Sequence, residues 1–128
     1  MIRAALLLWL LAAPAHAGGD AARGADAFAN CRPCHMVAAP SGKILVRGGR
    51  TGPNLWGVAG RAAGTAERFR YSPALAEAGA SGLIWTPDSF AAFIADPRGF
   101  LGAPSRMTYR YRGEAADLFA YLESLADD

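Results

Sequence analysis

The chain has 128 residues, which allows one domain at most. Glycine, alanine and proline are abundant, and the formal net charge at pH 7 is only +2. So small a net charge gives no reason to expect a nucleic-acid partner.

The first 17 residues have the pattern of a secretory leader. Arg3 precedes a short apolar run at residues 4–13, and Ala15-His16-Ala17 fits the small-x-small rule for cleavage. The apolar run is well short of the roughly 20 residues that span a bilayer. We therefore predict a signal peptide over residues 1–17, cleaved near Ala17, and one domain over residues 18–128. An uncleaved anchor is the alternative.

The domain is expected to open with a helix over residues 20–30, for which Asp20 is a suitable N-cap. Gly24 and Phe28 lie one turn apart on one face of this helix. A glycine inside a helix costs about 1 kcal/mol relative to alanine, so it usually has a packing reason. We expect another helix to approach closely at Gly24.

The sequence Cys31-Arg32-Pro33-Cys34-His35 follows this helix directly. Residues three and four apart share one face of a helix, so both cysteines and the histidine can meet one flat ligand. This spacing predicts covalent haem, with thioether bonds from Cys31 and Cys34 and with His35 on the iron.

The same two cysteines could also belong to a redox pair, a zinc site or a disulfide. A dithiol redox pair would need the cysteines alone, and no long α/β chain surrounds them. A structural zinc site needs two more ligands, and beyond the motif the chain offers only His16, in the leader. A disulfide between Cys31 and Cys34 would close too small a loop to stabilise the chain much.

The predicted domain has about 111 residues and few large side chains for a core. A domain of this size buries roughly 60–70% of the surface of its unfolded chain. A haem would supply a large apolar plate for the chain to wrap. We therefore expect the chain without haem to lack a stable fold.

Residues 36–52 read as a loop in which residues 43–47 could form a short extended hairpin. In the following Gly52-Pro53 step the proline has no N–H to donate, and its carbonyl is free to accept. A haem-ligating histidine needs an acceptor for its second ring nitrogen. We expect Pro53 to be that acceptor for His35, although Gly-Pro on its own is simply a turn.

Short helices are expected over residues 55–60, 73–78 and 87–96. Ser72 and Thr86 are suitable caps for the last two, each followed by a proline at the first helical position. Residues 100–112 read as a loop that carries Met107. A final helix is expected over about residues 113–125, where leucines and a tyrosine form an apolar stripe. No strand pattern of useful length appears.

In this order, these segments resemble class I cytochromes c, most of all the soluble, periplasmic, mitochondrial-like cytochromes c of α-proteobacteria. The resemblance covers nearly all of residues 18–128 and implies an all-α fold. That fold is the small cytochrome c fold, with three main helices, short helices and loops wrapped round one covalent haem c. The matching segments are Gly24, Phe28, residues 31–35, residues 48–55, Gly60-Arg61, residues 69–74, residues 83–85, residues 93–97, Met107 and residues 117–122.

The resemblance also implies roles for single residues. Cys31 and Cys34 would carry the thioethers, while His35 and Met107 would bind the iron from opposite faces. Met36 sits beside His35 and cannot reach the far face. The other expected site residues orient the histidine, bind a buried propionate or donate beside the methionine: Pro53, Arg61, Tyr71, Trp85 and Ser105. The crossing of the first and last helices would fall at Gly24 and Leu118.

Two departures from the family pattern stand out. The family commonly has a tyrosine at position 93, whose hydroxyl bonds to the ligand sulfur, and Phe93 cannot make that bond. The reduction potential and the strength of the iron–Met107 bond are therefore open. Before the methionine the family usually has Thr-Lys, whereas this chain has Ser105-Arg106, which keeps a donor and a charge.

An iron with two strong protein ligands has no open position, so the resemblance implies a periplasmic electron carrier and not an enzyme. Basic residues round the haem edge, including Arg32, Lys43, Arg106 and Arg110, would dock an acidic partner. The donor implied is a quinol–cytochrome c reductase. The acceptor implied is a terminal oxidase, a photosynthetic reaction centre or a periplasmic reductase, met by a monomer peripheral to the membrane.

Two alternatives remain at this point. In one, Met107 is easily displaced, and the protein is a haem enzyme with peroxidatic activity or a gas sensor. In the other, the domain works only as a subunit of a larger complex.

Overall fold

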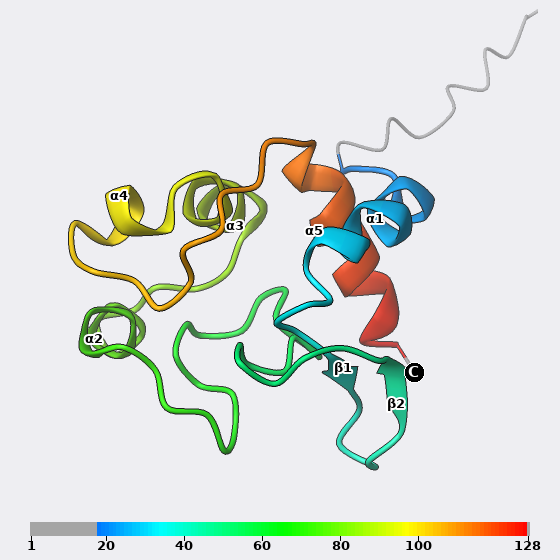
Figure 1. Ribbon diagram of the computed structural model, residues 1–128, viewed down its shortest axis with the longest axis horizontal. Helices are drawn as coiled ribbons and strands as arrows, with labels where there is room; N and C mark the ends of the chain where they lie inside the picture. The colour runs from blue at the N-terminus through cyan, green and yellow to red at the C-terminus, as the bar shows by residue number, and fades with distance from the viewer. Residues whose placement is uncertain (1–17, 128) are drawn as a thin grey trace, which may run out of the picture.

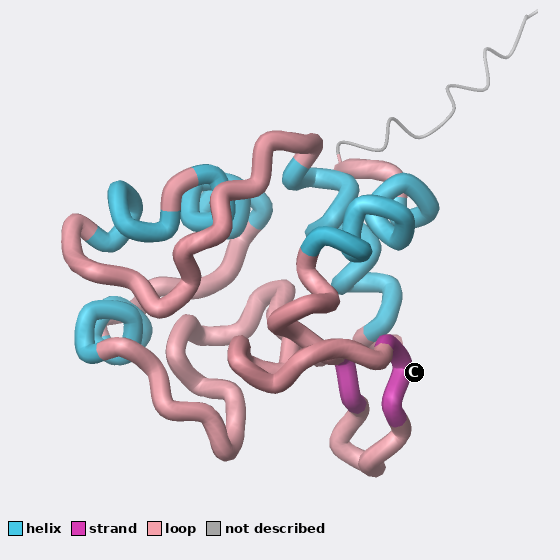
Figure 2. Tube along the Cα trace, viewed as in Figure 1, coloured by secondary structure: helices cyan, strands magenta, loops and turns pink. Residues whose placement is uncertain are grey.

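The computed structural model describes residues 18–127, so the predicted leader and its cleavage site lie outside it. Helices and long loops make up most of the chain, with one small hairpin (Figure 2). The elements in chain order are α1 (Ala21–Ala27), the 3-10 helix η1 (Phe28–Asn30), β1 (Val37–Ala38), β2 (Ile44–Val46), α2 (Pro73–Ala80), α3 (Pro87–Ala95), α4 (Pro97–Leu101) and α5 (Ala115–Leu125). The mostly helical fold predicted from the sequence is confirmed.

Helices α1 and α5 lie side by side although they come from opposite ends of the domain (Figure 1). The predicted crossing at Gly24 is present, because a Cβ at this position would lie 1.9 Å from the carbonyl oxygen of Asp117. Leu118 and Phe28, beside the crossing, are 2% and 1% exposed. Only glycine lets the two backbones come this close.

Three helices begin at the caps expected from the sequence. The side chains of Asp20 and Ser72 accept from Arg23 N and Leu75 N, at 3.0 and 3.4 Å. Thr86 accepts from Ser89 N at 3.2 Å, and the Ser89 hydroxyl accepts from Thr86 N at 2.8 Å, which completes a capping box.

Helix α2 continues to Ala80, two residues past the end expected from the sequence, so Gly79 does not stop it. Gly79 instead serves packing, since a Cβ there would lie 1.8 Å from the carbonyl oxygen of Ala63.

Two other expectations about the helices were wrong. Residues 55–60 form two turns and no helix, because Gly57 and Gly60 have φ values of 68° and 81°, which a right-handed helix cannot contain. Residues 97–101, expected to be partly loop, form helix α4. Its cap is Asp96, whose carboxylate accepts from Gly99 N at 3.1 Å.

The hairpin expected at residues 43–47 contributes strand β2, which pairs antiparallel with β1. Strand β1 was not predicted, because two residues are too few for a periodic pattern. Its Val37 is fully buried and belongs to the aromatic-rich core with Trp85, Phe90 and Phe93. No helix within residues 18–127 is long and apolar enough to cross a membrane.

Candidate functional site

A cavity of about 240 Å³ lies inside this core, and most of its lining is apolar. All nine site residues named from the sequence line it: Cys31, Cys34, His35, Pro53, Arg61, Tyr71, Trp85, Ser105 and Met107. They come from six separate segments, so only the fold brings them together. Their roles toward a haem remain predictions.

The cysteine–histidine motif forms a tight turn at the end of the first helix. His35 N donates to Cys31 O at 2.9 Å, which places Cys31, Cys34 and His35 along the same side of the turn. The segment that follows the hairpin packs against the motif, with Gly49 N donating to Arg32 O and Gly52 N donating to Cys34 O, both at 2.8 Å. The motif is therefore held by backbone bonds on its outer side.

The histidine ring has a defined orientation. Its Nδ1 lies 2.8 Å from the carbonyl oxygen of Pro53, which can only accept, so Nδ1 carries the proton and donates. The Nε2 atom is then left as a lone-pair donor. Burial lowers the pKa of His35, against the opposing effect of the Pro53 bond, and keeps the ring neutral at pH 7. A neutral imidazole with Nε2 free is the form that binds a metal.

The thiols are poorly suited to redox chemistry or to zinc binding. Burial, with a smaller effect from Cys34, raises the pKa of Cys31 to about 11. Redox and zinc-binding cysteines need the thiolate, which this environment disfavours. Within residues 18–127 no group of three or more histidine, cysteine or acidic side chains could hold a metal ion.

Met107 reaches the cavity from the segment between α4 and α5, far from the motif in sequence. Three contacts hold this segment. The Arg106 guanidinium donates to the Arg70 carbonyl, Arg110 pairs with Asp96 at 3.0 Å, and Tyr111 N donates to Ile94 O at 2.8 Å. The thioether therefore sits on a loop that is tied down on both sides of it.

One corner of the cavity is polar. Arg61 donates from Nη1 to Trp56 O at 2.7 Å and from Nη2 to Asn54 O at 3.4 Å, while its buried Nε has no partner in residues 18–127. Burial lowers the pKa of Arg61. The Tyr71 hydroxyl accepts from Ala66 N at 3.0 Å and keeps its own proton to donate.

An orphaned guanidinium N–H and a free phenol proton, both on residues that line the cavity, suit a buried carboxylate such as a haem propionate. The apolar walls suit the body of the macrocycle. The residues present therefore fit a haem.

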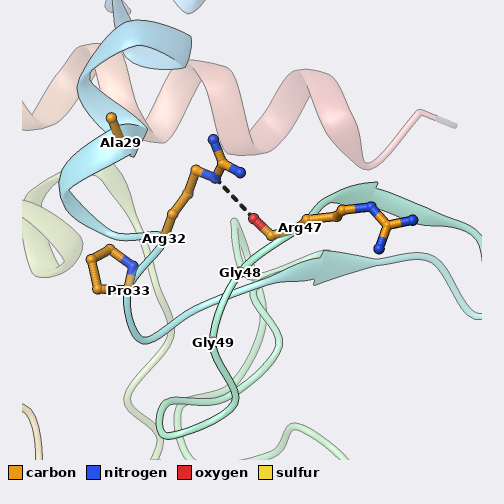
Figure 3. A pocket seen from close by; sticks show the side chains of 6 residues that line it. All are labelled: Ala29, Arg32, Pro33, Arg47, Gly48 and Gly49. Carbon is orange, nitrogen blue, oxygen red and sulfur yellow. Dashed lines mark hydrogen bonds between the residues drawn. The ribbon is translucent and has the colours of Figure 1, made fainter.

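Of the four basic residues expected round the haem edge, Arg106 lines the cavity, and Arg32, Lys43 and Arg110 do not. Arg32 lines a separate open depression with Arg47 and the Gly48-Gly49 step, and its Nε donates to Arg47 O at 2.9 Å (Figure 3).

Sequence reasoning also missed Asn54, which follows Pro53 directly and bonds to strand β1. The sequence carried no signal for this role, because the partner Ala38 lies 16 residues away.

A helical shell round one cavity, with the cysteine–histidine motif and a methionine in its lining, defines a small haem c protein. No protein-family model matches the chain. It is 44% identical over 128 residues to cytochrome c-551 of Roseobacter denitrificans, covering 94% of this chain and 91% of that protein. It is 42% identical over 123 residues to cytochrome c2 of Rhodobacter capsulatus, covering 91% of this chain and 89% of that protein.

Solved structures give the same result. The structure of cytochrome c2 from Rhodobacter capsulatus matches with a TM-score of 0.80 and 41% identity, covering 83% of this chain and 97% of that one. Cytochrome c2 from Paracoccus denitrificans matches with a TM-score of 0.81 and 36% identity, covering 85% and 98%.

The chain belongs to the cytochrome c2, c-550 and c-551 family of class I cytochromes c. Members carry one covalently bound haem c and are electron carriers of respiratory or photosynthetic chains, not enzymes. The family, fold, cofactor and type of activity inferred from the sequence are thereby confirmed, and nothing supports the enzyme alternative.

Proposed function

We propose that this chain is a periplasmic carrier that shuttles single electrons between membrane complexes, with His35 and Met107 as the iron ligands. The observation that supports it best is that the motif and Met107, which come from distant segments, line the same cavity. Haem bound there would supply reversible one-electron chemistry at iron.

The side chains have separate tasks in this proposal. Cys31 and Cys34 would anchor the haem covalently, and Pro53 would keep the His35 ring oriented through the 2.8 Å contact. Arg61, Tyr71 and Trp85 would bind a propionate, and Ser105 would donate beside the methionine. His35 and Met107 would hold the iron, and the apolar walls of the cavity would keep water and substrates away from it.

We propose the partners that the family resemblance implies. Cytochromes c2 are periplasmic redox shuttles between membrane complexes. For this chain the donor would be a quinol–cytochrome c reductase, and the acceptor a terminal oxidase, a photosynthetic reaction centre or a periplasmic reductase. Residues 1–17 would be the export signal, cleaved near Ala17.

Optical spectra of the matured protein test the ligand assignment, recorded in the ferric and ferrous states with and without carbon monoxide. Two protein ligands predict a low-spin spectrum, a weak far-red ferric band from the iron–thioether bond, and no response to carbon monoxide. A high-spin component or ready carbon monoxide binding would mean that Met107 is not a firm ligand.

The docking surface is tested by the salt dependence of the reaction with a redox partner. We expect the second-order rate to fall as salt rises, because Arg106 at the cavity would face an acidic partner. Arg106→Gln should flatten that dependence. Arg98→Gln is the matched control, since Arg98 is exposed on α4 and does not line the cavity. A rate that does not change with salt would rule out a basic docking face.

A further inference from the structure

We propose that Asn54 is a positioning residue for the histidine ligand, acting through the peptide that joins it to Pro53. This inference rests on the proposed function, because it concerns His35 as an iron ligand.

The Asn54 side chain is bonded on both of its polar atoms. Ala38 N donates to Oδ1 at 2.9 Å, and Nδ2 donates to Ala38 O at 2.8 Å. Trp56 N also donates to Oδ1, at 3.1 Å. Three hydrogen bonds to the backbone fix the position of the Asn54 side chain, so it is part of the local structure.

These bonds replace backbone pairing that Pro53 cannot make. The segment 53–56 runs beside residues 36–38, and Leu55 N donates to Met36 O at 3.1 Å. Pro53 has no N–H, so the ladder cannot continue through it. The primary amide of Asn54 carries one carbonyl and one N–H group in the same plane, like a peptide, and it completes the pairing with Ala38.

The pairing reaches His35 through one covalent unit. The Pro53 carbonyl that lies 2.8 Å from His35 Nδ1 belongs to the same planar peptide as Asn54 N. Arg61 holds the far side of the segment by donating to Asn54 O and Trp56 O. If the Asn54 side chain is lost, this peptide can tilt, and the Pro53 oxygen moves off the Nδ1–H direction.

Two neighbours on this side fix the ring. The Gly52 backbone lies against it, since a Cβ there would be 2.4 Å from His35 Cε1, and the Pro53 oxygen lies 2.8 Å from Nδ1. The Gly52 contact is steric, so the Pro53 oxygen is the hydrogen-bond acceptor through which Asn54 would act on the ring.

The experiment uses the mature haem-loaded protein with ¹⁵N-labelled histidine. The sequence has two histidines and His16 lies in the predicted leader, so His35 gives the one ring signal expected. Three variants are compared with the unchanged chain: Asn54→Ala, Asn54→Asp and the control Arg23→Ala. Arg23 pairs with Asp117 at 3.3 Å, in the α1–α5 contact and away from residues 35–56.

Two quantities are measured in the ferrous protein: solvent exchange of His35 Nδ1–H and the midpoint potential. Asn54→Ala should speed the exchange by about tenfold and shift the potential, as expected for loss of a group that orients a ligand. Asn54→Asp keeps the acceptor for Ala38 N and Trp56 N, so its effect should be smaller. It also serves as the test if Asn54→Ala does not fold.

Each variant's global stability is measured alongside, so that exchange through unfolding can be subtracted. If exchange and potential in both Asn54 variants match Arg23→Ala at equal stability, Asn54 is only structural and the inference is overturned. If the unchanged protein lacks the shifts of a coordinated His35 ring, it is the proposed function that fails.

Discussion

Position 52 illustrates how a single residue sets the geometry of the ligand. A Cβ on Gly52 would lie 2.4 Å from Cε1, 2.7 Å from Nδ1 and 2.9 Å from Nε2 of His35. Gly52→Ala should push the ring away from Pro53, because the ring is rigid and its other side faces the haem cavity. We expect weaker low-spin character in optical spectra and a free energy of unfolding lower by about 1–3 kcal/mol.

The control for this change is Gly18→Ala, because a Cβ at Gly18 would meet no atom within 4 Å. An unaltered spectrum and stability in Gly52→Ala would show that the ring can move without cost.

Phe93 is the residue at which this chain departs from the family pattern. It lines the cavity, is 8% exposed and packs on Trp85 and Phe100, with ring centroids 5.0 and 5.8 Å away. Phe93→Tyr should shift the midpoint potential, because a hydroxyl added in this cavity can donate to the ligand sulfur. Potentiometric titration measures the shift.

Phe119→Tyr is the matched control, since Phe119 is a buried aromatic residue that does not line the cavity. A potential that moves equally in both variants would remove the special role of position 93.

At this scale the sequence predicted nine of the residues that line the cavity, because the motif and the family pattern identify them one by one. It did not predict how Arg61 divides its donors between two carbonyls and a free Nε. Asn54 was missed for a related reason, since its partner Ala38 lies 16 residues away and is visible only in the fold.

Among the contacts between elements, the α1–α5 crossing leaves no room for a side chain at Gly24. In Gly24→Ala the gain in helix propensity is about 1 kcal/mol, but the new methyl group meets a backbone oxygen at 1.9 Å that cannot rotate away. The clash should prevail and lower the free energy of unfolding by about 1–3 kcal/mol, measured by urea denaturation.

Ala25→Gly, at an exposed position of the same helix, is the control and should show the propensity effect alone, a loss of about 1 kcal/mol. If Gly24→Ala proves stabilising, the two helices do not need a glycine at the crossing.

Three of the helices that the sequence predicted have local start signals, although α4 was missed despite its own cap at Asp96. Asp20, Ser72 and Thr86 each satisfy a backbone donor three residues on, which depends on nothing else in the chain. The other errors depend on longer range or on backbone angles. Strand β1 exists only because β2 folds back on it, and the turns at Gly57 and Gly60 need left-handed φ values that a pattern of apolar residues does not reveal.

For the molecule as a whole, the cavity lies within the core, and several of its walls are core residues, such as Phe28, Val58 and Phe90. Left empty, a cavity of about 240 Å³ would cost about 6 kcal/mol at roughly 24 cal/mol per Å³. That is comparable to the whole stability of a small domain, about 5–15 kcal/mol.

We therefore predict that the chain with both Cys31 and Cys34 changed to alanine, and made without haem, shows no cooperative thermal transition by circular dichroism. The haem-loaded protein is the control. A cooperative melt of the haem-free chain would show that the protein part folds on its own.

Charge was the least predictable property at this scale. The sequence places Asp117 in a run of acidic residues that would ordinarily be solvated. In the fold Asp117 is 6% exposed, and its carboxylate accepts from Asp20 N at 2.7 Å and from Arg23 Nε at 3.3 Å. A count of charges cannot distinguish a solvated carboxylate from one that joins two helices.

That link between Asp20 and Asp117 spans 97 residues and has a consequence for the order of folding. Of the described helices, α1 leaves the ribosome first and α5 last, so α1 has no partner while the rest of the domain is being made. The bond between Asp20 and Asp117 cannot form before Asp117 has been made, and forming it closes a loop of nearly the whole domain. The pairing of α1 with α5 is therefore possible only when the domain has been synthesised almost to its end.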